Sequence, residues 1–591
     1  MQLQTLVPLQ ILPILIPYVT AEAPSFSFPT YPALSYASPI PQAGPAPTYA
    51  PSFEDLAHLV KNQTTTKWAT IASPTDSADK FGNLAWSSLW VNISVTAPPF
   101  TTTASPTSMQ KSEVVKPTPL PFPVDDPETS AYTFPSYFLY GFTSAAVQIE
   151  GAVKNEGRGP TYVELITIPS VNTTKGGGRP DITTLNYYLY KQDIARLAAV
   201  GVKTYAFSIS WSRILPFAVP GSPVNQEAID HYDDLINTVL EYGMTPVVTL
   251  QHLDTPLPLA TRTSFQGWDH PDFVESFLNY AQIVLVHYSD RVGTWVTFNE
   301  PTVDAAQFNN WASGYNIVMA HAKVVHWYRD FIKGSGKWSL KLAFSPGFAL
   351  PLDPTNSSDV AAAIRRTEFD VGHIANPLFL GMPIPVSVSS TIGEKAPTFT
   401  TEELAYVNGT CDYLAFDLYT TTYHTSPPEG IDACAVNPLN PLFPYCTILL
   451  RGRDGWEVGT RSNTMIGGSI FYQHMRTVLQ YLNTVYPAKD GIMITEIGFP
   501  IFDAYDMTIE QERVEITQSV FYQSMLNEVL KSIHEDQVNV TGFLGWSYVN
   551  NWEWGQFDDH YGVQAFNQTT LERFYKRSIF DFVDFIDAHS I

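Results

Sequence analysis

The stretch GIMITEIGFP, from Gly491 to Pro500, decides the fold of this chain. Four apolar or β-branched residues run directly into the carboxylate of Glu496, and Gly498 and Pro500 end the run. Short apolar runs bounded by glycine and proline are typical of buried strands. A second run, TWVTFNE, ends in the same way on Glu300. The sequence therefore predicts two buried strands that each end on an acidic side chain.

Eight strand-like runs follow one another after residue 131, and amphipathic stretches with helical spacing lie between several of them. The runs are YFLYGFTSA, KTYAFSISW, TPVVTLQH, TWVTFNE, SLKLAFSP, YLAFDLYT, GIMITE and VTGFLGWSYV. This alternation predicts a parallel sheet, and the number of runs predicts a closed α/β fold, the (β/α)8 TIM barrel, over residues 132–591. An open doubly wound sheet is the alternative. It usually has fewer strands, and no G-x-G-x-x-G turn follows the first run.

The positions of Glu300 and Glu496 predict a catalytic site. Functional residues of such barrels lie at the C-terminal ends of strands. Glu300 ends the fourth run and Glu496 the seventh, so the two carboxyl groups are expected to face each other across the barrel mouth. Glycoside hydrolysis uses such a pair, one as proton donor and the other as nucleophile or base. Either acid alone would more often cap a helix or solvate a loop.

The chain also resembles a known family, the family 1 glycoside hydrolases. TFNEP resembles its acid/base motif and ITEIG its nucleophile motif. Further matching segments are FLYGFTSAAVQIEGAVKNEGRGPTYVE, FSISWSRILP, GMTPVVTLQHLDTPLPL, DYLAFDLYT and WSYVNNWEW. The resemblance implies a TIM barrel and a retaining β-glycosidase, specifically a β-glucosidase. Glu300 would be the acid/base and Glu496 the nucleophile.

Carried over by position, the resemblance also implies a set of sugar-binding residues. Amides and carboxylates suit the hydroxyl groups of a hexose, and a flat indole suits its C–H face. Taken singly, a histidine or a tryptophan in these segments would more often belong to the core. The expected residues are Gln148, His252, Asn299, Tyr419, Trp546, Glu553 and Trp554.

Three departures from the family pattern surround the expected nucleophile. Ala206 stands where the family usually has arginine, Asp417 where it has asparagine, and Ile497 where an asparagine follows the nucleophile. An arginine beside a carboxylate favours its ionised form, and a neighbouring acid disfavours it. We therefore expect a nucleophile that ionises less readily and weaker turnover. Leu253 replaces a usual tryptophan, which predicts a reshaped aglycone side.

Composition limits the range of partners. The chain has 591 residues, 45% of them hydrophobic, and a formal net charge of -24. This charge opposes binding to nucleic acid, and no segment after the N-terminus has the roughly 18 apolar residues of a membrane span. There is no H-E-x-x-H or C-x-x-C motif, so we expect neither a metal nor a cofactor. The expected partner is a carbohydrate, a β-glucoside.

The N-terminal region predicts export. Residues 1–23 resemble a signal peptide ending at an A-x-A site, although an uncleaved tail is the alternative. Residues 24–131 are rich in Pro, Ser and Thr and predict a largely irregular extension, a linker or stalk, in which FEDLAHLV and NLAWSSLWVNIS could dock on the barrel. Cys434 and Cys446 could close a loop and leave Cys411 free. N-glycosylation acceptors occur at Asn62, Asn92, Asn172, Asn356, Asn408, Asn539 and Asn567.

Two functions fit these observations. The first is a secreted retaining β-glucosidase that releases terminal β-linked glucose from glucosides or short oligosaccharides. The second is a glycan-binding or wall-associated protein on the same barrel, with turnover weakened by the changes at Ala206, Asp417 and Ile497. Hydrolysis of an aryl β-glucoside would separate them.

Overall fold

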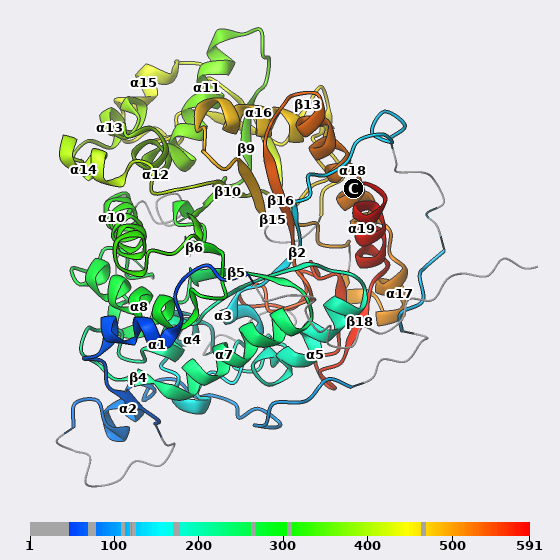
Figure 1. Cartoon of the computed structure of the whole chain (residues 1–591). Coiled ribbons are helices and arrows are strands. Elements are labelled where there is room, and N and C mark those ends of the chain that lie inside the picture. The colour runs from blue at the N-terminus through cyan, green and yellow to red at the C-terminus, as the bar shows by residue number, and fades with distance from the viewer. Residues whose placement is uncertain are drawn as a thin grey trace, which may run out of the picture.

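The computed structural model describes residues 47–68, 79–107, 113–118, 120, 126–168, 178–261, 264, 266–303, 310–462, 468–502 and 504–590. Its centre is a sheet of nine strands in the order β7-β6-β5-β3-β2-β16-β15-β10-β8. The two ends of this sheet, β7 and β8, are separated by Leu340 alone. They form one stave, so the sheet closes into an eight-stave barrel surrounded by helices (Figure 1). The predicted (β/α)8 barrel is confirmed.

The barrel strands coincide with the eight runs predicted from the sequence. Every pairing between neighbouring staves is parallel. The strands are β2 (Leu139–Thr143), β3 (Thr204–Ser208), β5 (Thr245–Gln251), β6 (Thr294–Phe298), β7 (Lys337–Ser339), β8 (Lys341–Ala343), β10 (Leu414–Asp417), β15 (Ile492–Ile497) and β16 (Val540–Trp546).

Amphipathic helices cover the outside of the barrel. In α7, for example, Ile229, Tyr232, Ile236 and Val239 are buried while Asp230 is exposed, the spacing of a helix with one apolar face. The longer helices are α5 (Asn186–Ala199), α7 (Gln226–Glu241), α8 (Phe273–Tyr288), α10 (Ser313–Trp327), α11 (Ser357–Thr367), α16 (Met475–Val485), α18 (Thr517–His534) and α19 (Arg577–Ala588).

Shorter elements complete the described chain. The helices are α1 (Phe53–Leu56), α2 (Asn83–Leu89), α3 (Ala146–Ile149), α4 (Tyr162–Thr167), α6 (Trp211–Ile214), α12 (His373–Ala375), α13 (Val386–Ile392), α14 (Thr401–Val407), α15 (Ile431–Ala435) and α17 (Ile509–Val514). The strands are β1 (Thr65–Thr66), β4 (Val224–Asn225), β9 (Phe348–Pro351), β11 (Thr421–Thr425), β12 (Ile448–Leu450), β13 (Gly452–Arg453), β14 (Trp456–Glu457), β17 (Gln564–Phe566) and β18 (Arg573–Tyr575).

Side chains alternate between the barrel interior and the layer under the helices, as the pleat of a strand requires. In β3, Tyr205 and Phe207 belong to the main core between sheet and helices. Ala206 instead packs with Val247 and Met493 in a small apolar cluster. That cluster draws on several staves, so it fills the inside of the barrel beneath the mouth.

The segment between β10 and β15 contributes β11 and β12 to a small sheet, β12-β11-β9, whose third strand precedes β10 in the chain. Here Cys434 and Cys446 form a disulfide, the pairing that the sequence left open. Cys411 is a free, buried thiol. Within the described residues, no helix has both the length and the apolar character to cross a bilayer.

The described parts of the N-terminal extension lie against the barrel. Trp86 in α2 is fully buried, and its indole N–H donates to the carbonyl oxygens of Gly157 at 2.9 Å and Arg158 at 3.0 Å. Farther along, the backbone N–H of Thr96 donates to the Asp181 carboxylate at 2.6 Å. Both expected docking segments therefore contact the barrel, through α1 and α2 (Figure 1). The predicted signal peptide lies outside the described residues.

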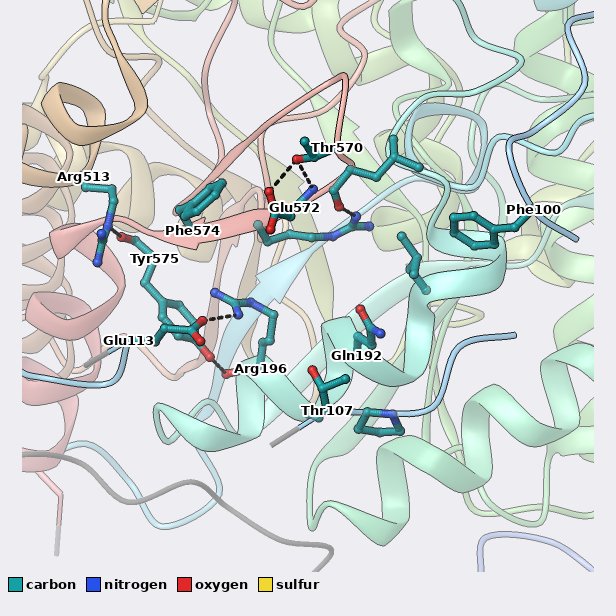
Figure 2. Close-up of a pocket in the computed structure, with 15 residues that line it drawn as sticks. Phe100, Thr107, Glu113, Gln192, Arg196, Arg513, Thr570, Glu572, Phe574 and Tyr575 are labelled. Carbon is teal, nitrogen blue, oxygen red and sulfur yellow. Dashed lines mark hydrogen bonds and ion pairs between the residues drawn. The ribbon is translucent and has the colours of Figure 1, made fainter. Parts of the chain in front are cut away.

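A cavity of about 520 Å³ lies between the extension, α5 and the hairpin β17-β18 (Figure 2). Phe100, Thr107 and Glu113 of the extension line one part of it, and Gln192 and Arg196 of α5 another. Arg196 donates to Glu113 at 3.0 Å across this junction. None of the sugar-binding or catalytic residues expected from the sequence lines the cavity, so it is separate from the barrel mouth.

Candidate active site

The two expected catalytic acids meet at the mouth of the barrel. Glu300 lies two residues after β6, and Glu496 lies near the end of β15. Carboxylate oxygens of Glu300, Asp417 and Glu496 all lie within 4.8 Å of one another. Retaining glycosidases hold their two carboxyl groups about 5–5.5 Å apart, whereas inverting enzymes need about 6.5–9.5 Å for a water molecule. The upper bound of 4.8 Å between these oxygens is nearer to the first range than to the second.

The environment of Glu300 suits a proton donor. Burial, and then the neighbouring charge of Glu496, raise the pKa of Glu300 from its ordinary value of 4.5 to about 8, although Lys341 opposes the shift. A carboxyl group with such a pKa is protonated at neutral pH. Glu300 also has a left-handed backbone, with φ of 45°, a conformation that non-glycine residues adopt rarely and mostly at functional sites.

A polar and aromatic wall adjoins the two acids. The Glu553 carboxylate accepts the Trp546 indole N–H at 3.0 Å on one oxygen and the Gln148 side-chain N–H at 2.9 Å on the other. Burial raises the pKa of Glu553 to about 8. Trp546 is stacked on His252, with ring centroids 5.9 Å apart. Tyr419 and Trp554, both half-buried, pack in the same aromatic cluster.

Two buried polar side-chain atoms near the two acids have no hydrogen-bond partner among the described residues. Among the described residues, neither Asn299 Oδ1 nor His252 Nδ1 has a hydrogen-bond partner. Asn299 is 1% exposed and His252 2% exposed, so water does not readily solvate these atoms. Buried polar groups are normally satisfied, and exceptions require an explanation. Sugar hydroxyl groups both donate and accept hydrogen bonds, so they would supply a partner for each of the two atoms.

Comparisons with known proteins agree with this site. The model of glycosyl hydrolase family 1 matches residues 130–591. The chain belongs to glycosyl hydrolase family 1. It is 31% identical over 474 residues to β-glucosidase 34 of rice, Oryza sativa subsp. japonica, covering 76% of this chain and 91% of that protein. It is 30% identical to β-glucosidase 1B of Phanerodontia chrysosporium, covering 75% and 84%.

Solved structures of family 1 enzymes have the same fold. A rice β-glucosidase in a covalent complex with Glc superposes with a TM-score of 0.69 at 29% identity, covering 78% of this chain and 100% of that chain. A β-glucosidase from the fungus Humicola insolens in complex with glucose also gives 0.69 at 29% identity, covering 77% and 99%. The chain is therefore a glycoside hydrolase.

In this family 1 hydrolase, Glu496 is held from two sides. The Tyr419 hydroxyl donates to Glu496 Oε2 at 3.1 Å. Lys341 Nζ donates to Glu496 Oε1 at 2.6 Å, and His252 Nε2 lies 3.9 Å from the same oxygen. Lys341 thus places a cation beside this carboxylate, in a chain whose Ala206 stands at the family's usual arginine position.

The other two departures have different surroundings. Asp417 is paired with Glu496 across neighbouring strands, and its Oδ1 accepts the Thr495 hydroxyl at 2.7 Å. Burial, and then the charge of Glu496, raise the pKa of Asp417 well above its usual range. A protonated Asp417 has the shape of the family's asparagine. Ile497 packs in the main core under the helices and is fully buried.

Lys341 is the site residue that the sequence reasoning missed. It lies in the run SLKLAFSP, where it is the only charged residue among apolar neighbours. Lysine is almost never fully buried without a partner, so a lysine inside a predicted buried strand indicates a carboxylate close by. That signal was available in the sequence, but it does not say which carboxylate Lys341 meets.

Proposed function

We propose that this family 1 hydrolase is a retaining β-glucosidase that releases terminal β-linked glucose from glucosides or short oligosaccharides. The observation that carries the proposal is the separation of the acids, whose oxygens lie within 4.8 Å. This distance is closer to the about 5–5.5 Å of retaining enzymes, in which one carboxylate attacks the sugar directly, than to the about 6.5–9.5 Å of inverting enzymes.

The first half of the reaction forms a glycosyl ester. Glu300, protonated at neutral pH, gives its proton to the glycosidic oxygen, so the aglycone leaves as a neutral alcohol or phenol. Glu496 attacks the anomeric carbon from the opposite face, and its carboxylate oxygen forms the new bond. The rice relative captured in a covalent complex with Glc supports such an intermediate.

The second half releases the sugar. Glu300 is now ionised and accepts a proton from a water molecule, whose oxygen attacks the anomeric carbon. The ester bond to Glu496 breaks, and both carboxyl groups return to their starting states. Two inversions give net retention of the anomeric configuration.

The neighbouring side chains fit a hexose in this position. Glu553 and Gln148 can accept and donate hydrogen bonds to adjacent hydroxyl groups, and the Trp546 ring can cover the C–H face. The unpaired atoms of Asn299 and His252 add two further polar contacts. Asn299 adjoins Glu300, which suits a contact to the 2-hydroxyl that tightens in the transition state.

We also propose that the protein is secreted and glycosylated. A disulfide between Cys434 and Cys446 fits an oxidising compartment. Acceptor asparagines are exposed at positions 62, 92, 356, 408 and 539, and Asn567 is half-buried. Asn172 lies outside the described residues. Mass analysis of the protein from culture medium, before and after removal of N-glycans, tests both statements.

Turnover of a nitrophenyl β-glucoside tests the catalytic proposal. Wild-type protein should hydrolyse it with retention, seen by NMR as the β-anomer of glucose appearing first. The Glu496→Gln variant should lose activity by at least about 10⁴-fold while binding glucose as before, since the nucleophile is removed but the pocket is kept. Glu275→Gln, an exposed residue of α8 ion-paired with Lys323, is the matched control. A folded wild type that binds glucose without turnover would instead establish the binding protein.

A further inference from the structure

Lys341 is a buried cation inside the barrel. It belongs to β8, its Cα is paired with that of Ala415 in β10, and its side chain is 2% exposed. The ammonium group lies 2.6 Å from Glu496 Oε1. Removing a lysine from water costs several kcal/mol unless a close opposite charge compensates it. Its burial therefore depends on the carboxylate of Glu496.

The acidic groups of the candidate site act on Lys341. Burial disfavours the ammonium, but Asp417, Glu496 and Glu300 outweigh burial and raise the pKa of Lys341. His252, on the other side of Glu496, has its pKa lowered well below the usual range, by burial and then by Lys341, so it stays neutral. Among the described residues, Lys341 is therefore the cation that is paired with Glu496.

The position where the family usually has arginine supplies no cation for Glu496 in this chain, because it holds Ala206. Ala206 is 4% exposed and lies in the interior cluster with Met493 and Leu544. Its short side chain carries no charge, and the other members of this cluster carry none either. Lys341 enters the same interior from the fifth stave of the barrel, whereas Ala206 lies on the second.

We propose that Lys341 is a positioning residue that pairs its charge with Glu496 and fixes the plane of that carboxylate, taking over from the fifth stave of the barrel the role of the arginine lost at Ala206. The inference rests on the proposed role of Glu496 as nucleophile. Lys341 holds Oε1 while Tyr419 holds Oε2, so the carboxylate has one orientation. An ammonium at this distance favours the anionic form that attacks the sugar.

Three variants test the proposal through the pH dependence of kcat/KM on a nitrophenyl β-glucoside. Lys341→Met keeps the length of the side chain and removes the charge; we expect a loss of about 10²–10³-fold at neutral pH, the usual cost of one electrostatic contact in a transition state. The acid limb of the profile should move upward by about 1–3 pH units, because a carboxylate without a nearby cation ionises at higher pH. Lys341→Arg should recover at least about tenfold of the loss, since it restores the charge.

Lys337→Met is the matched control. Lys337 begins the same stave, but its side chain is 56% exposed and its partner is Asp490 at 3.2 Å. This variant should keep the wild-type pH profile. The proposal is overturned if Lys341→Met keeps kcat/KM within about threefold of wild type, or loses activity with an unmoved acid limb and no recovery by Lys341→Arg.

A double-mutant cycle separates this proposal from the proposed function. Lys341→Met and Glu496→Gln are made singly and together, and the unfolding rate of each protein is measured at one temperature. A coupled pair should depart from additivity by at least about tenfold. If the two substitutions are coupled but the wild type shows no turnover, only the glucosidase proposal is refuted. If their effects on the unfolding rate are additive, the role of Lys341 is refuted.

Discussion

Replacing Glu300 by glutamine tests how burial creates the proton donor. With the pKa at about 8, roughly nine-tenths of Glu300 is protonated at pH 7, whereas an ordinary value of 4.5 would leave about one part in 300 protonated. The site therefore increases the population of the proton donor by about 300-fold at this pH. Glutamine keeps the shape of the side chain but cannot donate a proton to the leaving oxygen.

The leaving group determines the size of the expected loss. For an alkyl glucoside, Glu300→Gln should lower kcat/KM by about 10²–10⁴-fold, the usual contribution of general acid catalysis. A dinitrophenyl glucoside leaves as a stable anion without a proton, so its kcat/KM should fall less than about tenfold. Its kcat should fall further, because the variant lacks the base that activates water against the glycosyl ester.

The pH profile of the wild type gives the second readout. A raised pKa means that Glu300 is protonated below about pH 8 and ionised above it, so kcat/KM should be retained below this pH and decline above it. Assayed on the same alkyl glucoside as the wild type, Glu300→Gln should lack that alkaline limb. Equal losses on both substrates, or an unchanged alkaline limb in the variant, would refute the assignment of Glu300 as the acid.

Three further outcomes follow from the same contacts. Glu553→Gln should raise KM or lower kcat/KM for glucosides by about 10–10³-fold, measured on a panel of sugar epimers, because an amide NH₂ replaces one of the two carboxyl oxygens that accept hydrogen bonds from Trp546 and Gln148. Lys341→Ala combined with Ala206→Arg should regain at least about tenfold over Lys341→Ala alone in kcat/KM, since the cation returns from the second stave. Trp86→Ala should destabilise the fold by about 3–5 kcal/mol, seen as faster thermal inactivation, because a fully buried indole and its hydrogen bonds are lost.

The barrel could be predicted because local patterns specify it. Each of the eight runs is an apolar segment short enough for a strand, and helical spacing between them leaves few other topologies. Glu300 and Glu496 could be located because both end such runs. The fifth stave is less regular than predicted, because Leu340 interrupts it between β7 and β8.

The contacts around the nucleophile could not be predicted from the same patterns. Whether Lys341 reaches Glu496 depends on how a side chain from the fifth stave crosses the barrel interior, which is a property of packing and not of sequence spacing. Similarly, the sequence around Trp86, which is rich in Pro and Ser, does not indicate that its indole donates to the carbonyl groups of Gly157 and Arg158. Residues that make these contacts are far apart along the chain, and a single sequence contains no signal that connects them.

Charge balance explains why the three departures belong together. With arginine and asparagine, the family places one cation beside one carboxylate. This chain has lost the arginine at Ala206 and gained both Lys341 and a carboxyl group at Asp417. Burial and the charge of Glu496 raise the pKa of Asp417 well above its usual range, and the neighbouring carboxyl groups outweigh burial and raise the pKa of Lys341. Both shifts act in the direction of one cation beside one carboxylate, which is the charge balance that the proposed role of Glu496 as nucleophile requires.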